Sequence, residues 1–524
     1  MRRSDRRRFL AEVGQGLMIA TVGLGTAVDM GLAAEPKGEP AGRIDFGSRE
    51  RLVGLMQDTP IEQLQQVLVG QMSAGVSLRE LVAAGALANA RTFGGEDYIG
   101  FHSFMALAPA LAMAGQLPTQ QAALPVFKVL YRNSSRMQAR GGSSAEVLHP
   151  ISSAPPGDGP LPDPAPLAQQ IRQAIQARDL PRAEALLAVA AGRSPQDAFN
   201  AVLPTVADGV EVHRTVLAYR AWDLLELVGQ EQALTFLRQS LHYCHDNNKP
   251  GSEQRWADIR TLLPKVIDQY RLEQVAVGTR QADDAWIEST TEFLLKATPA
   301  QAADCIAAAI ADGMNIDSIG HVVSLGANQL LLRDPGRIPR YAQENKPAGS
   351  VHGDSVGVHA SDSVNAWRHI AQVSNRRNSV ASLILAGWQV ANDRQYSPGI
   401  EQGTAQRPSA EQLQKVDARD ADALLAALQD AIKTNDQERA CAVTQIYGEQ
   451  GHGVERVSAI FLDHAITSDG ALHAEKYFRT ASEEFGRLSP KFRWRQMVSL
   501  ARVTASANGY AAPGVAEAKR LLGA

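Results

Sequence analysis

The chain has 524 residues, of which 44% are hydrophobic and 21% charged, and its formal net charge is only −4. This composition is typical of a soluble globular protein, and because it indicates no basic face, it excludes nucleic acid as an expected partner. The length exceeds that of one ordinary core, so we expect two domains or one large duplicated domain.

Residues 1–34 have the pattern of an export signal. The segment has a basic start that includes Arg6 and Arg7, a Gly-rich and mildly apolar middle, and small residues at its end. The paired arginines favour the twin-arginine route, which carries folded proteins across the bacterial inner membrane, over an ordinary Sec signal or a membrane anchor. We expect cleavage near Ala34 and a periplasmic or secreted protein. No later segment has the roughly 18 uninterrupted apolar residues of a spanning helix, so we expect no membrane contact after cleavage.

The rest of the chain repeats one helical pattern, which we assign to residues 48–270 and 285–524. In each copy apolar residues recur every three or four positions, as in amphipathic helices, and strand-like alternation is scarce. Superposing His102 on His359 aligns further residues on both sides of the two histidines. We therefore predict an all-α protein with an internally duplicated helical domain, in which two like halves pack together.

Two histidine pairs match between the copies: His102 with His359, and His213 with His473. Each ring stands at a predicted helix start, where the positive end of the helix dipole favours the neutral imidazole, which can bind a metal or act as a base. Because equivalent positions of a duplicated core can meet around one pseudo-axis, we predict that these four rings face one another and form the catalytic and metal-binding site. The alternative is that each ring only ties down its own turn through a buried hydrogen bond.

The second copy adds polar residues just before His359. His352 and Asp354 lie there, and nitrogen and carboxylate ligands of this kind suit iron, copper or zinc. Asp354 corresponds to Asp97 in the first copy, and a carboxylate at this place can orient a metal-bound imidazole through its second nitrogen. We therefore include His352 and Asp354 among the candidate metal ligands.

His242 and His245 lie three positions apart on one predicted helix and so share a face. Such a pair could hold a metal. The sequence DNNKPG that follows ends the helix, however, and this favours capping of the helix end by the two rings.

Three segments place a histidine at the start of an alanine-containing helix: FHSFMALAPALAMAG at His102, VHRTVLAYRAWDLLE at His213 and VHASDSVNAWRHIA at His359. In this respect the chain resembles the questin oxidase-like family of helical proteins. The resemblance implies an oxygenase that acts on an aromatic ketone or quinone, with these three histidines lining its pocket.

Two functions are compatible with these patterns. The first is an exported, metal-assisted oxidoreductase whose histidines hold a metal and which acts on a small-molecule substrate. The second is a non-catalytic helical scaffold that binds a protein or glycan partner and whose histidines are structural. The sequence contains no HExxH helix, P-loop or dinucleotide-binding motif, and the GxSxG pattern at residues 353–357 lacks the preceding strand that a nucleophile elbow requires. The placement of the four rings therefore decides between the two.

Overall fold

The computed structural model describes residues 42–151, 163–249, 253–397 and 404–524. The predicted export signal lies outside the described residues. Residues Phe46–Ala524 form one compact unit, and both predicted repeat units lie within it. The described residues form helices and a few isolated β-bridges but no strand. The predicted all-α class is therefore confirmed.

The first half contains α3 (Glu50–Asp58), α4 (Ile61–Ser73), α5 (Leu78–Phe93), α6 (Tyr98–Ala114), α7 (Ala123–Ala139), α8 (Pro164–Gln176), α9 (Leu180–Arg193), α10 (Pro195–Ala207), α11 (Val212–Asp223), α12 (Leu225–Val228), α13 (Ala233–Asp246) and α14 (Glu253–Gln269). The second half contains α15 (Asp284–Leu294), α16 (Pro299–Ala311), α17 (Ile316–Leu332), α18 (Val356–Val373), α19 (Arg376–Arg394), α21 (Ala410–Gln414), α22 (Ala421–Lys433), α23 (Gln437–Glu449), α24 (Val454–Thr467), α25 (His473–Arg487), α26 (Trp494–Ala507) and α27 (Val515–Leu522). Within the described ranges, none of these helices combines the length and the apolar character that crossing a membrane requires.

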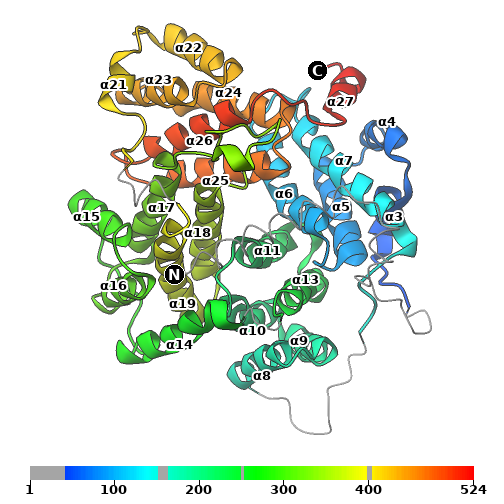
Figure 1. Cartoon of the computed structure of the whole chain (residues 1–524). Helices are drawn as coiled ribbons and strands as arrows, with labels where there is room; N and C mark the ends of the chain where they lie inside the picture. The colour runs from blue at the N-terminus through cyan, green and yellow to red at the C-terminus, as the bar shows by residue number, and fades with distance from the viewer. Residues whose placement is uncertain (1–41, 152–162, 250–252, 398–403) are drawn as a thin grey trace. The chain divides into compact units, whose positions relative to one another are not determined.

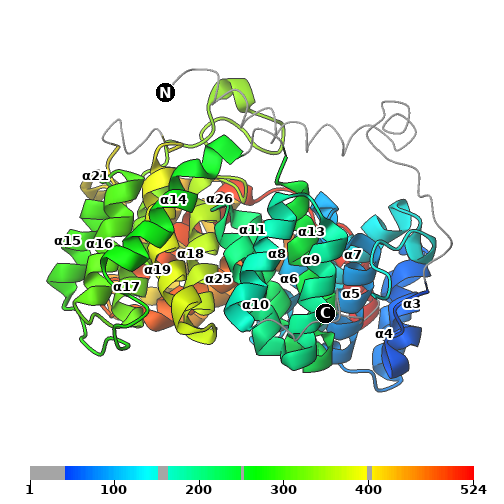
Figure 2. The ribbon, with the colours of Figure 1, turned by 90° about the horizontal axis from the view of Figure 1, so that it is seen from below.

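Four helices at the centre of the compact unit pack in a closed cycle (Figure 1, Figure 2). Helix α6 contacts α11 and α25, and α18 contacts the same two helices. On their outer sides, α5 and α7 pack against α6, whereas α17 and α19 pack against α18. Each half therefore contributes two neighbouring helices to the cycle, and the halves are joined where α11 contacts α18 and where α25 contacts α6.

Side-chain caps fix where the central helices begin. The Asp97 carboxylate accepts a hydrogen bond from a backbone N–H of α6, and Glu211 and Ser355 do the same for α11 and α18. These are residue types that satisfy the unpaired N–H groups of a first helical turn. Helix α25 instead starts directly after Leu472, which has a left-handed φ of 66°. Each helix start carries one of the four matched histidines.

Two glycines allow the outer helices to approach the central helices closely. A Cβ added at Gly357 in α18 would lie 2.5 Å from the backbone of Leu331 in α17, and one added at Gly100 in α6 would lie 2.5 Å from the ring of Phe93 in α5. Each glycine lies two residues before a matched histidine. The close packing therefore holds the histidine-bearing turns in place.

Gly357→Ala should separate α17 from α18, because the methyl group would meet backbone that cannot rotate away. We expect the free energy of unfolding, measured in urea, to fall by about 1–3 kcal/mol. Gly70→Ala in α4 is the matched control, since nothing lies within 4 Å of its added Cβ, and it should raise stability by up to about 1 kcal/mol. Equal effects of the two substitutions would contradict this role of Gly357.

Candidate functional site

The structure brings His102, His213, His359 and His473 together at the starts of α6, α11, α18 and α25. The ring centroids of His102 and His213 are 4.7 Å apart, and those of His102 and His473 are 5.1 Å apart. His359 lies 5.5 Å from His213 and 5.6 Å from His473. The four rings form a closed cycle in which each ring neighbours one ring of its own half and one of the other half.

The Nε2 atoms of His102 and His213 are only 3.1 Å apart. The Nδ1 atom of His102 lies 2.7 Å from the carbonyl oxygen of Tyr98, and that of His213 lies 2.5 Å from a carboxylate oxygen of Glu211. A carbonyl or a carboxylate can only accept, so each Nδ1 carries the hydrogen, and a neutral ring then has a lone pair on Nε2. When both rings are neutral, two lone pairs face each other, and the contact then requires a proton or a metal ion between them.

Glu211 fixes the orientation of His213. Besides the histidine ring, its carboxylate accepts hydrogen bonds from the Tyr243 hydroxyl at 2.8 Å and from the backbone N–H of Arg214 at 3.1 Å. Burial raises the pKa of Glu211, but the charge of His213 and these hydrogen bonds outweigh that effect and hold the pKa well below its ordinary value. Sequence reasoning missed Glu211, although a carboxylate at a helix start two residues before a histidine was a usable signal.

His359 and His473 each have a buried Nε2 atom without a hydrogen-bond partner in the described structure. Burial is the largest cause that lowers the pKa of both rings and of His102, and the charge of Lys476 lowers all three pKa values further. For His359 the pKa falls to about 3. At neutral pH these three rings are uncharged and keep a lone pair that can bind a proton or a metal.

The four histidines differ in exposure. The His213 side chain is 13% exposed and His359 is half-buried, whereas His102 and His473 are buried. Tyr98 is 49% exposed, and its ring lies 4.3 Å from the ring of His102. Of the four histidines, His213 and His359 are therefore the ones that solvent reaches most easily.

Asp354 does not act on a histidine ring in the described structure, contrary to the prediction. Its carboxylate binds Arg337 at 2.7 Å and Lys346 at 2.8 Å. Burial raises the pKa of Asp354, but these two cations outweigh it and hold the pKa well below its usual range. His352 has a buried Nε2 atom without a partner, and burial is the main cause that lowers its pKa to about 4. The ring of His352 is therefore neutral, whereas Asp354 is occupied as an ion-pair partner.

Asp97 is likewise not the orienting carboxylate that its match with Asp354 predicts. It caps α6 and forms ion pairs with Arg136 at 2.6 Å and Arg140 at 3.2 Å. The groups that orient the rings are the carbonyl of Tyr98 and the carboxylate of Glu211.

As the side chains stand, no group of three or more His, Cys, Asp or Glu residues in the described part of the chain is arranged so that it could hold a metal ion. The four rings are close, but they do not converge on one point. A shared metal would therefore require the rings to move.

His242 is clamped between two carboxylates, which differs from the predicted capping of the helix end. Its Nδ1 lies 2.7 Å from Glu96 and its Nε2 lies 2.6 Å from Glu184. Burial lowers the pKa of His242, but the hydrogen bonds and charges of the two glutamates outweigh it, and the pKa is raised. The ring of His245 contacts its neighbour Asp246, with its Nδ1 3.1 Å from the carboxylate. Neither ring joins the four-histidine cluster.

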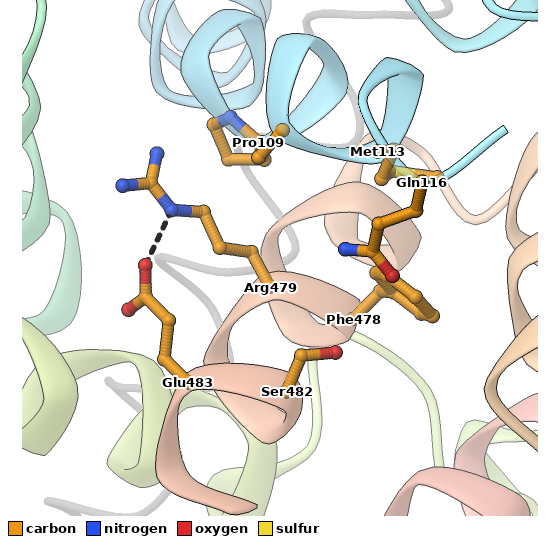
Figure 3. A pocket seen from close by; sticks show the side chains of 8 residues that line it. Pro109, Met113, Gln116, Phe478, Arg479, Ser482 and Glu483 are labelled. Carbon is orange, nitrogen blue, oxygen red and sulfur yellow. Dashed lines mark hydrogen bonds and ion pairs between the residues drawn. The ribbon is translucent and has the colours of Figure 1, made fainter. Parts of the chain in front are cut away.

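A cavity of about 150 Å³ lies between α6 and α25 (Figure 3), and none of the four matched histidines lines it. Its walls include Pro109 and Met113 of α6 and Phe478 of α25. Its charged residues are already paired, because Arg479 binds Glu483 within the cavity wall and Asp223 beyond it. We therefore place the candidate site at the four histidines rather than in this cavity.

No protein-family model matches the chain, and neither a curated protein nor a solved structure is detectably similar to it. The resemblance to the questin oxidase-like family stays a prediction.

The clamp around His242 predicts a pH-dependent contribution to stability. Because the folded-state pKa is raised above the ordinary value of 6.5, the clamp stabilises the protein fully below pH 6.5, and this contribution is lost as the pH rises through the folded-state pKa. His242→Gln should therefore lower the free energy of unfolding more at about pH 5.5 than at about pH 9. His452→Gln is the matched control, since it removes a histidine that lies outside the clamp and contacts Gln450 at 2.9 Å. A pH-independent effect of His242→Gln would contradict the charged clamp.

Proposed function

We propose that the chain is an exported oxidoreductase in which His102, His213, His359 and His473 hold one redox-active metal ion. The observation that carries the proposal is the 3.1 Å contact between the Nε2 atoms of His102 and His213. A proton shared by His102 and His213 would satisfy that contact, but it would leave the buried Nε2 atoms of His359 and His473 without partners. One metal ion would provide a partner for all four.

The spacing of the rings supports a shared ion. Two nitrogens that bind one metal at about 2.1 Å lie about 3.0–3.4 Å apart for angles between 90° and 109°, and their ring centroids lie about 4.6–5.3 Å apart. The pairs of His102 with His213 and with His473 fall in this range, whereas both distances from His359 are slightly longer. A movement of the His359 ring by about half an ångström would bring it into the same range.

The chemistry of the ligands favours a redox-active ion. Imidazole binds iron, copper and zinc well. Four neutral ligands add no negative charge, so they stabilise the reduced form of iron or copper and keep both oxidation states accessible. When bound, such an ion would supply one-electron chemistry to a substrate that enters past His213. The chain's own contribution is to hold His213 through Glu211 and His102 through the Tyr98 carbonyl, so that each ring presents Nε2.

An internal duplication accounts for the site. Under the proposed superposition α6 corresponds to α18 and α11 corresponds to α25, and the packing of the four helices follows this correspondence. The short ring distances correspond in pairs as well, with 4.7 Å matching 5.6 Å and 5.1 Å matching 5.5 Å. Gly100 and Gly357 also correspond and both lie at close helix contacts. We infer that one metal site was built from two equivalent half-sites.

Elemental analysis of the purified mature protein should find one iron or copper ion per chain, which can be oxidised and reduced reversibly. His359→Ala should lower the metal content at least tenfold without changing the circular dichroism or the unfolding of the metal-free protein, because this half-buried ring packs less tightly than the other core residues. His452→Ala, outside the cluster, should retain the metal.

Three outcomes would contradict parts of this proposal. A metal-free protein, or one whose metal content is unaffected by His359→Ala, would contradict the metal centre and favour the non-catalytic scaffold for a protein or glycan partner. Zinc bound by the same four rings would preserve the metal centre but contradict the redox function.

The proposed export through the twin-arginine route also has a direct test. Folding before transport would allow the metal to be inserted in the cytoplasm. Replacing Arg6 and Arg7 together by lysine should therefore block the appearance of the protein in the periplasm, as measured by cell fractionation, whereas replacing Arg2 and Arg3 by lysine should not. Continued export of the first variant would indicate an ordinary Sec signal.

A further inference from the structure

The four-histidine cluster contains a buried lysine without an ion-pair partner. Lys476 lies on α25, three residues after His473 and on the same side of that helix. The residue is only 4% exposed. Among the described residues, no carboxylate oxygen lies within 4.0 Å of its ammonium nitrogen. Such a residue is uncommon, because a buried ammonium group is normally paired.

Three carboxylates act on the charge of Lys476, and each of them has another partner. Glu475 forms an ion pair with Lys128 at 2.6 Å. Asp362 accepts a hydrogen bond from Thr480 at 2.7 Å, and burial raises the pKa of its carboxyl group. Glu211, the third acidic group, is bound to His213 and two other donors. No carboxylate is therefore dedicated to the charge of Lys476.

The field at Lys476 is mixed. Burial lowers the pKa of Lys476 to about 8, and the carboxylates of Asp362, Glu475 and Glu211 oppose this shift. Lys476 lies about one helical turn after His473, and its charge lowers the pKa of three of the four rings. The starts of α6, α11, α18 and α25 meet at these rings, and each directs the positive end of a helix dipole toward them. Four helix starts and an ammonium group without an ion-pair partner together favour an anion as the ligand.

We propose that the site binds a small carboxylate anion whose charge is balanced by Lys476. The inference builds on the proposed metal centre by naming the class of substrate, yet it rests on the unpaired lysine and the four helix starts, which are present with or without a metal. The anion enters past His213 and His359, the more exposed rings, and lies against the ammonium group. A carboxylate there gives Lys476 the charged hydrogen-bond partner that the described chain does not provide.

Formate is the probe, and formamide is its uncharged analogue of similar size. Calorimetric titration of the mature protein, both metal-loaded and metal-free, should show that formate binds at least tenfold more tightly than formamide. Lys476→Met should weaken formate binding at least tenfold at unchanged metal content, whereas Lys476→Arg should retain part of it. Lys491→Met, which changes a half-exposed lysine paired with Glu288, should bind formate like the original protein.

The possible results separate the two proposals. Equal binding of formate and formamide by the unaltered protein would overturn the anion site without any need for a variant, as would full formate binding by a folded Lys476→Met protein. A protein that loads metal but fails these tests retains its metal centre and loses the anion site. A protein that binds no metal but shows Lys476-dependent formate binding retains the anion site and loses the metal centre.

Discussion

The site depends on one contact, the 3.1 Å approach of the Nε2 atoms of His102 and His213. Each ring uses its Nδ1 hydrogen on an oxygen that can only accept, so two neutral rings would bring two lone pairs together. Buried polar atoms in native proteins rarely lack a partner. The Nε2 atoms of His359 and His473 also lack a hydrogen-bond partner in the described structure. The cycle of rings therefore contains several nitrogens whose lone pairs need a partner. A single bound cation would provide a partner for the Nε2 atoms of all four rings.

The helix caps and close helix contacts keep the four rings near one another. The caps at Asp97, Glu211 and Ser355 fix three helix starts, and the close approaches at Gly100 and Gly357 hold two of the histidine-bearing turns against their outer helices. The backbone that carries the rings is therefore fixed, and the rings can still move by side-chain rotation. Such rotation is needed before the rings could share a metal, because they do not converge on one point as they stand.

Sequence reasoning succeeded where a signal was repeated along the chain. The spacing of apolar residues predicts the helices, and the match of His102 with His359 and of His213 with His473 singles out the rings that the structure brings together. Spacing along the chain cannot show which neighbour a carboxylate meets in space, so Asp354 and Asp97 were assigned to histidines although their partners are arginines and a lysine. The buried charge of Lys476 depends on tertiary packing and has no sequence signature.

X-ray absorption spectroscopy of the metal in the purified mature protein tests the central claim most directly, because it reports the ligands of the ion rather than its presence alone. The account predicts iron or copper surrounded by four nitrogens at about 2.1 Å, with the outer-shell scattering that imidazole rings produce. A shell with sulfur ligands, or with fewer than three imidazoles, would contradict it.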